Sequence, residues 1–183
     1  MRTWYGVTLN ASGCVSSLDM DGELAIDRFG GEGNNLNGSI PDALWDLTDL
    51  EMLSLVRNRN LSGSISSKIG NMTKLTRFFI AGSLTGTIPE EIGNLTRLTH
   101  LTINSNHGIT GSVPTSFRNL VNLKDLFLGR NQLTQLPDLG TLVNIEQLDI
   151  SENQFSGSLP LWVVNFNKMF NFFAYQNLSL IHI

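Results

Sequence analysis

The sequence lacks the features that mark several large classes of protein. It has a single cysteine, Cys14, so no disulfide can form within the chain and the redox compartment stays open. No apolar run approaches the roughly 18 residues of a membrane span, and the first ten residues lack the apolar stretch of a signal peptide. The formal net charge is -4 and no basic block occurs, which disfavours nucleic acid as a partner. With 41% hydrophobic residues, the chain can still bury one sizeable core.

Recognisable catalytic chemistry is also missing. The three histidines, His100, His107 and His182, are too scattered for metal-ligand spacing. No nucleophile elbow, zinc-protease or kinase signature occurs, and the glycine-rich stretch before Asn34 lacks the lysine of a phosphate-binding loop. The sequence therefore predicts no enzyme activity, no metal site and no cofactor.

What the sequence does have is a repeat. Copies open at Leu50, Leu75, Leu98, Leu123, Ile145 and Met169, and subtracting successive numbers gives 25, 23, 25, 22 and 24 residues. The first five of these copies open with three apolar positions, of which the last two are two residues apart, as in Leu148 and Ile150. That spacing indicates a short strand with one buried face, and such strands must stack in parallel into a solenoid.

Two further positions recur in most copies. An asparagine follows the strand at Asn58, Asn106, Asn131 and Asn153, and we expect this column to bond backbone groups inside the coil. The copy that opens at Leu75 is the third repeat when an interrupted copy before Leu50 is counted as the first. It is one residue short and has Ser83 at the asparagine position, so we expect a local tightening of the coil. A Leu-x-Gly-x-Ile-Pro stretch comes next, and all five prolines of the chain fall at its end. The segments after it, such as EEIGNLTR, are too short for ordinary helices and predict helical turns or 3₁₀ helices.

These motifs resemble the plant-type subclass of the leucine-rich repeat family, whose pattern is LxxLxxLxLxxNxLxGxIPxxLGxL. The resemblance covers residues 15–177, as about six complete repeats and the start of a seventh, and residues 1–14 resemble that subclass's N-terminal hairpin cap, with Trp4 as its apolar plug. It implies an α/β right-handed solenoid with a concave parallel sheet and convex 3₁₀ segments. An insertion at residues 23–33 interrupts the first repeat and is expected to be an exposed loop.

The strand period predicts which side chains face the concave surface, where binding is expected. Phe79 and Phe127 are the informative positions, because exposed aromatic residues are enriched where proteins bind; packing against neighbouring strands is the alternative. Arg77 and Arg130 flank them and could hold a carboxylate. The predicted ligand-binding residues are Arg77, Phe79, His100, Thr102, Asn104, Asp125, Phe127, Arg130, Gln147 and Asp149.

Modification and the chain end give two further expectations. Asn-x-Ser/Thr sequences would carry N-linked glycans in a secreted protein, and they occur at Asn10, Asn37, Asn60, Asn71 and Asn94. Residues 178–183, LSLIHI, break the repeat pattern and match the translation of a sequencing adapter, so we expect a tail that is not native.

The expected function is a non-catalytic module that recognises a protein or peptide ligand through its concave face. It would be the repeat region of a larger receptor-like or secreted protein, at the cell surface or outside the cell, with a co-receptor as a further partner. Two alternatives are an intracellular scaffold, in the cytoplasm, and the sensor portion of a receptor kinase whose catalytic domain lies outside this segment. Surface binding to ice or a polysaccharide needs a flat, regular Thr/Asn face, and the concave columns are too irregular for it.

Overall fold

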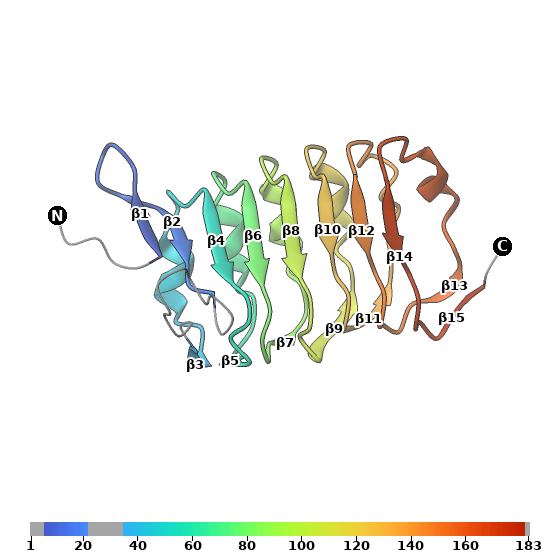
Figure 1. Ribbon diagram of the computed structural model, residues 1–183, viewed down its shortest axis with the longest axis horizontal. Coiled ribbons are helices and arrows are strands. Elements are labelled where there is room, and N and C mark those ends of the chain that lie inside the picture. Colours follow the sequence, from blue (N-terminus) through green and yellow to red (C-terminus); the bar gives the residue numbers. More distant parts are fainter. Residues whose placement is uncertain (1–5, 22–34, 182–183) are drawn as a thin grey trace.

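The computed structural model describes residues 6–21 and 35–181, and these form a stack of coils that each carry one strand of a continuous sheet. The sheet has eight strands in the order β1-β2-β4-β6-β8-β10-β12-β14 (Figure 1). Their bounds are β1 Val7–Leu9, β2 Val15–Asp19, β4 Met52–Leu55, β6 Arg77–Ile80, β8 His100–Ile103, β10 Asp125–Phe127, β12 Gln147–Asp149 and β14 Asn171–Phe173. All neighbours pair in parallel except β1 and β2, which form the antiparallel hairpin expected for the cap. Trp4, Asn34 and the insertion at 23–33 lie outside the described residues.

The core lies behind this sheet and is built from the repeated apolar positions. Leu53, Phe78, Leu101, Leu126 and Leu148 pair in register along the central strands, and all are fully buried. One apolar side chain from each coil therefore joins a continuous column, which no single repeat could bury by itself.

Short 3₁₀ helices form the convex side, as the segment lengths predict. They are η1 Asp42–Asp46, η2 Ser67–Asn71, η3 Glu90–Asn94, η4 Thr115–Asn119 and η5 Leu161–Asn165. An extended proline precedes four of the five helices, because its fixed φ suits the turn into a helix. Ser66 replaces proline before η2 and accepts the Lys68 N–H at 3.3 Å. Trp45 of η1 and Trp162 of η5 both pack on this side. Trp45 is 2% exposed, and the centroid of the Trp162 ring lies 5.4 Å from that of Phe166.

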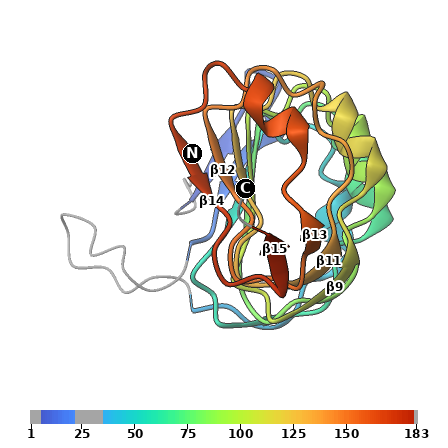
Figure 2. The same cartoon turned by 90° about the vertical axis from the view of Figure 1, so that its right-hand side faces the viewer.

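A third side carries short strands from the glycine-containing stretches. They are β3 Asn37–Ser39, β5 Asn60–Ser62, β7 Thr85–Gly86, β9 Gly108–Ser112, β11 Gln132–Gln135, β13 Ser156–Ser158 and β15 Ser179–Ile181. They pair in parallel as three small sheets, β3-β5, β7-β9-β11 and β13-β15. Viewed end-on, the eight-stranded sheet, the 3₁₀ helices and these outer strands enclose the core (Figure 2).

The asparagine column lies inside the coil and links each repeat to the one before it. Asn58, Asn106, Asn131 and Asn153 are buried. Asn153 shows the pattern: its Nδ2 donates to the Leu128, Ser151 and Ile150 carbonyls, and its Oδ1 accepts the Leu133 N–H at 3.0 Å. Asn177 repeats this arrangement, so the column extends into the seventh repeat. The expectation that these amides bond backbone groups is confirmed.

Candidate functional site

The concave face of the eight-stranded sheet presents two columns of side chains, in the register that the strand period predicts. The first column runs through Arg77, His100, Asp125, Gln147 and Asn171. The second runs through Ser54, Phe79, Thr102, Phe127, Asp149 and Phe173. Neighbouring members stand one strand spacing apart, about 4.8 Å.

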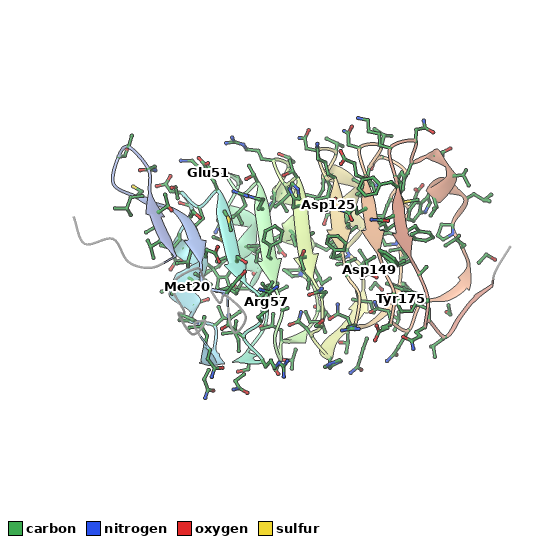
Figure 3. All side chains as sticks on the ribbon, viewed as in Figure 1. Met20, Glu51, Arg57, Asp125, Asp149 and Tyr175 are labelled. Carbon is green, nitrogen blue, oxygen red and sulfur yellow. The ribbon has the colours of Figure 1, made fainter. Side chains whose placement is uncertain are left out.

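Two hydrogen bonds and one ion-pair contact join four members of the first column across four strands. Asn171 Nδ2 donates to Gln147 Oε1 at 3.0 Å, and Gln147 Nε2 donates to Asp125 Oδ1 at 3.2 Å. The other Asp125 oxygen lies 3.3 Å from His100 Nε2, which completes the chain. Because Asp125 and Gln147 already bond their neighbours, they form a fixed polar band in the upper half of the sheet (Asp125 is labelled in Figure 3).

The aromatic residues of the second column do not pack against each other. Thr102 stands between Phe79 and Phe127, which places the two rings about 9–10 Å apart by strand spacing. Phe79 instead makes an edge contact with the His100 ring, at 6.5 Å and 80°. Both phenylalanines are half-buried, so one side of each ring faces solvent. Phe173 and Tyr175, at the last strand, are more open, at 42% and 53% exposed.

A groove of about 890 Å³ lies along the edge where the strands end. Among its walls are Phe79, Thr102, Asn104 and Arg130, so the structure brings these four predicted residues together. The other six predicted residues, Arg77, His100, Asp125, Phe127, Gln147 and Asp149, lie on the open face outside the groove. Figure 3 shows Arg57 at the lower end of the strands and Asp125 higher on the sheet.

The groove also carries charged and titratable side chains that are not among the ten predicted ligand-binding residues. Arg57, Arg59, His107, Asp21 and Glu152 all line it. These residues lie in the turns that follow the strands. The two-residue period of a strand does not predict which way a side chain in such a turn points. The signal available in the sequence was Arg57-Asn58-Arg59, two arginines on either side of a column asparagine.

The two arginines proposed to flank the phenylalanines occupy different places. Arg130 Nε donates to Glu152 Oε1 at 2.9 Å, and this contact raises the pKa of Arg130. Its guanidinium is therefore already partly engaged. Arg77 begins β6 on the open face, outside the groove. A carboxylate held between Arg77 and Arg130, as the sequence suggested, does not fit this arrangement.

Asp21 closes one end of the groove in a partly buried position. Burial raises the pKa of its carboxyl, while the Ser54 hydroxyl, which donates to it, works in the opposite direction. The Val56 N–H donates to the same oxygen at 3.2 Å. Asp21 is thus bonded within the wall and is poorly placed to receive a ligand's cation.

Neither metal nor membrane features mark the part of the chain that the structure describes. Within residues 6–21 and 35–181, no group of three or more His, Cys, Asp or Glu side chains could hold a metal ion. None of the helices found there is long and apolar enough to cross a bilayer. The groove and the two columns are therefore the candidate site.

Comparison with known proteins begins with a family model. A model described as leucine rich repeat matches residues 96–155. No curated protein matches the chain.

Solved structures match over nearly the whole chain. The ectodomain of the Arabidopsis receptor kinase HAESA, in complex with an N-terminally extended IDA peptide hormone, is 27% identical with a TM-score of 0.73. The ectodomain of the Arabidopsis thaliana membrane receptor kinase GASSHO1/SCHENGEN3, in complex with CASPARIAN STRIP INTEGRITY FACTOR 2, is 29% identical with a TM-score of 0.63. Pollen Receptor Kinase 3 is 22% identical with a TM-score of 0.80.

The shares covered differ between these structures. The matches cover 95%, 90% and 98% of this chain, but 36%, 24% and 81% of HAESA, GASSHO1/SCHENGEN3 and Pollen Receptor Kinase 3, respectively. This chain thus spans well under half of the first two ectodomains. The repeat unit, the family model and the likeness to the HAESA ectodomain together support the plant-type leucine-rich repeat family as the family of this chain.

Proposed function

We propose that the chain is a non-catalytic module that binds a peptide or protein segment along its concave face. The groove supports this proposal most directly. It combines the half-buried ring of Phe79, the polar side chains of Thr102 and Asn104, and charged side chains at one edge of the sheet. An extended peptide lying across the strands would contact Phe79, Thr102 and Asn104 in the groove. The open face beside it adds Phe127 and the polar band.

The nature of the parent protein is also a proposal. The GASSHO1/SCHENGEN3 and HAESA ectodomains described above were both solved as complexes, that of HAESA with a peptide hormone ligand. That likeness favours the sensor region of a receptor-like protein over an intracellular scaffold. A kinase domain and a co-receptor would then belong to the whole protein and its assembly.

The aromatic residues offer the test. A Phe79→Ala, Phe127→Ala double variant and the wild type would be compared for capture of peptides from a displayed random library and for stability in urea. Phe170→Ala is the matched control, since Phe170 is 66% exposed and precedes β14 outside both columns. We expect the double variant to lose about tenfold or more in affinity for the captured peptides, and the control to keep it. Unchanged peptide affinity together with a large loss of stability would show that the two rings only pack.

A second candidate is surface binding to ice or a polysaccharide, and one observation favours it. Hydroxyl residues recur on the outer strands, where Thr85, Thr110 and Thr134 each bond a glycine carbonyl of the preceding repeat at 3.3, 3.4 and 3.2 Å. The outer strands thus carry the regular row of threonine hydroxyls that the concave columns lack. Ice-crystal growth in the presence of wild type and of a Thr110→Lys variant would separate this function from peptide binding.

A further inference from the structure

The third repeat differs from the others at the turn that lines the groove. In the second and in the fourth to seventh repeats, the residue before the column asparagine has positive φ: Arg57 62°, Ser105 55°, Arg130 60°, Glu152 52° and Gln176 54°. The third repeat is one residue short, and none of Ala81, Gly82 and Ser83 has positive φ. It therefore lacks the left-handed residue that makes the turn elsewhere.

The shortened turn is held against the second repeat. The Ser83 N–H donates to the Leu61 carbonyl at 2.7 Å, and the Ser83 hydroxyl donates to the Arg59 carbonyl at 2.7 Å. Gly82 is so close that a Cβ there would lie 2.8 Å from the Leu61 oxygen. The tightening expected at Ser83 is therefore an approach towards the second repeat.

The opposite side of the same turn is loose. The Nδ2 of Asn106 lies 3.5 Å from the Ile80 carbonyl. The equivalent bonds from Asn58, Asn131, Asn153 and Asn177 measure 2.8, 2.7, 2.9 and 3.1 Å.

The oxygen of Asn106 also lacks its usual donor. Asn58, Asn131, Asn153 and Asn177 each accept a backbone N–H of the preceding repeat. Asn106 Oδ1 is buried and is the unpaired buried side-chain polar atom of the described chain. Buried polar groups are nearly always bonded, so this oxygen marks a gap between the third and fourth repeats.

The charges around this gap are unbalanced. Arg57 and Arg59 of the second repeat and His107 of the fourth line the groove, and they make no ion pair with any described carboxylate. The two carboxylates of the groove are engaged elsewhere: Glu152 pairs with Arg130, and Asp21 accepts bonds from Ser54 and Val56. Arg57 and Arg59, with His107 beside the groove, are therefore the groups left to meet a ligand.

We propose that the gap between the third and fourth repeats is a subsite for an acidic side chain of the bound peptide. The carboxylate would lie between Arg57, Arg59 and His107, with the Phe79 ring against its methylene groups. One water, donating a hydrogen to Asn106 Oδ1 and the other to the carboxylate, would satisfy the unpaired oxygen. This subsite rests on the proposed peptide-binding function and adds to it the chemical class of one anchoring residue.

Peptides selected from a random displayed library test the subsite. On the wild type, we expect the captured peptides to share an aspartate or glutamate at one position. Replacing that acid by its amide should weaken binding about tenfold. In an Arg57→Gln, Arg59→Gln variant, acid and amide peptides should bind alike. Glutamine suits these positions, since Gln176 and Gln132 occupy equivalent places in other repeats.

Two further proteins complete the design. Arg97→Gln, Arg118→Gln removes the same charge from exposed positions outside the groove, and it should keep the preference for acid. Insertion of an asparagine between Gly82 and Ser83 restores the length of the turn and offers Gly82 for the left-handed position. We expect this insertion to close the gap and abolish the preference for acid while other peptide contacts remain.

The possible failures are distinguishable. Captured peptides without a shared acid, or a preference for acid that survives both the arginine variant and the insertion, would overturn the subsite alone. Failure of the wild type to capture any peptide would overturn the proposed function and the subsite with it.

Discussion

At the scale of single residues, the column asparagines Asn58, Asn131, Asn153 and Asn177 each bond four backbone groups. Each turn brings carbonyl and amide groups inside the coil, where water cannot bond them, and an amide side chain can both donate and accept. Asn153 bonds three carbonyls and one N–H in this way. Asn106 makes fewer bonds: its Nδ2 donates to two carbonyls, and the third repeat gives its oxygen no donor.

This difference predicts unequal costs for one substitution at two equivalent positions. Asn153→Ala leaves several buried backbone groups unpaired and should lower the free energy of unfolding by about 2–4 kcal/mol. Asn106→Ala removes fewer bonds and one unpaired oxygen, so its cost should be smaller by about 1 kcal/mol or more. Urea denaturation of both variants measures the difference, and equal losses would contradict the gap.

Asp21 gives a prediction that depends on pH. Its pKa is raised above the ordinary 3.8 chiefly by burial, so the folded state favours the protonated form. The stability this contributes is present below pH 3.8 and is lost as the pH rises through the folded pKa. Asp21→Asn keeps Oδ1, the acceptor of both bonds, and removes the charge. Because the carboxyl is partly exposed, the gain should be small, about 1–2 °C in Tm at pH 7.

The comparison across pH provides the control for Asp21→Asn. Thermal unfolding of wild type and variant at pH 7 and at about pH 3 should show the advantage of the variant at pH 7 only. A variant that is less stable than the wild type at pH 7 would show that the carboxylate is needed in the wall.

At the scale of elements, the close stacking of η3 on η4 depends on a glycine. A Cβ on Gly93 of η3 would lie 2.4 Å from Ser116 Cβ and 2.7 Å from the Ser116 carbonyl oxygen of η4. The equivalent position in η4 is Arg118, which is exposed. The fifth repeat, which is two residues shorter, forms no helix after Pro137, and this leaves room for the arginine.

The two positions should respond differently to alanine. Gly93→Ala forces η3 and η4 apart and should cost about 1–3 kcal/mol of unfolding free energy. Arg118→Ala should change it by less than about 0.5 kcal/mol. Calorimetry on both variants measures the costs; if Gly93→Ala were harmless, the helices would be shown to separate easily.

The strands could be predicted from the sequence and the groove could not, for a physical reason. Side chains alternate between the two faces of a strand, so the spacing of apolar residues predicts which of them face the concave side. The columns that contain Phe79 and Asp125 were therefore predicted correctly. The groove depends on turns whose direction is set by contacts between repeats, as with Arg130 and Glu152, which are 22 residues apart. The short third turn was visible as a missing residue, but its lean towards the second repeat rests on bonds from Ser83 that no local pattern specifies.

At the scale of the whole molecule, the glycosylation sequences lie away from the proposed binding face. Asn37 and Asn60 are exposed in the outer strands, and Asn71 and Asn94 are exposed at the ends of η2 and η3. Asn10 lies in the hairpin turn, where its side-chain oxygen accepts two backbone N–H groups. The N-terminal half would therefore carry all the glycans of a secreted form.

This placement predicts that glycans and peptide coexist. In protein produced through a secretory pathway, mass spectrometry should find glycans at the four exposed asparagines and less modification at Asn10. Enzymatic removal of the glycans should leave the affinity for selected peptides unchanged within about twofold, because none of the five asparagines lines the groove. Loss of peptide binding after removal would contradict the placement of the site.

The gap between the third and fourth repeats is confined to one edge of the stack. On the sheet side, β6 and β8 remain joined through four paired residues, from Arg77 with His100 to Ile80 with Ile103. On the outer side, β7 and β9 are joined as well, through Thr85 with Gly108 and Gly86 with Ile109. The gap is therefore confined to the turn between two lines of paired strands. Because both lines hold the spacing of the two repeats, an occupant would meet walls that are already in place, and its binding would leave the curvature of the stack unchanged.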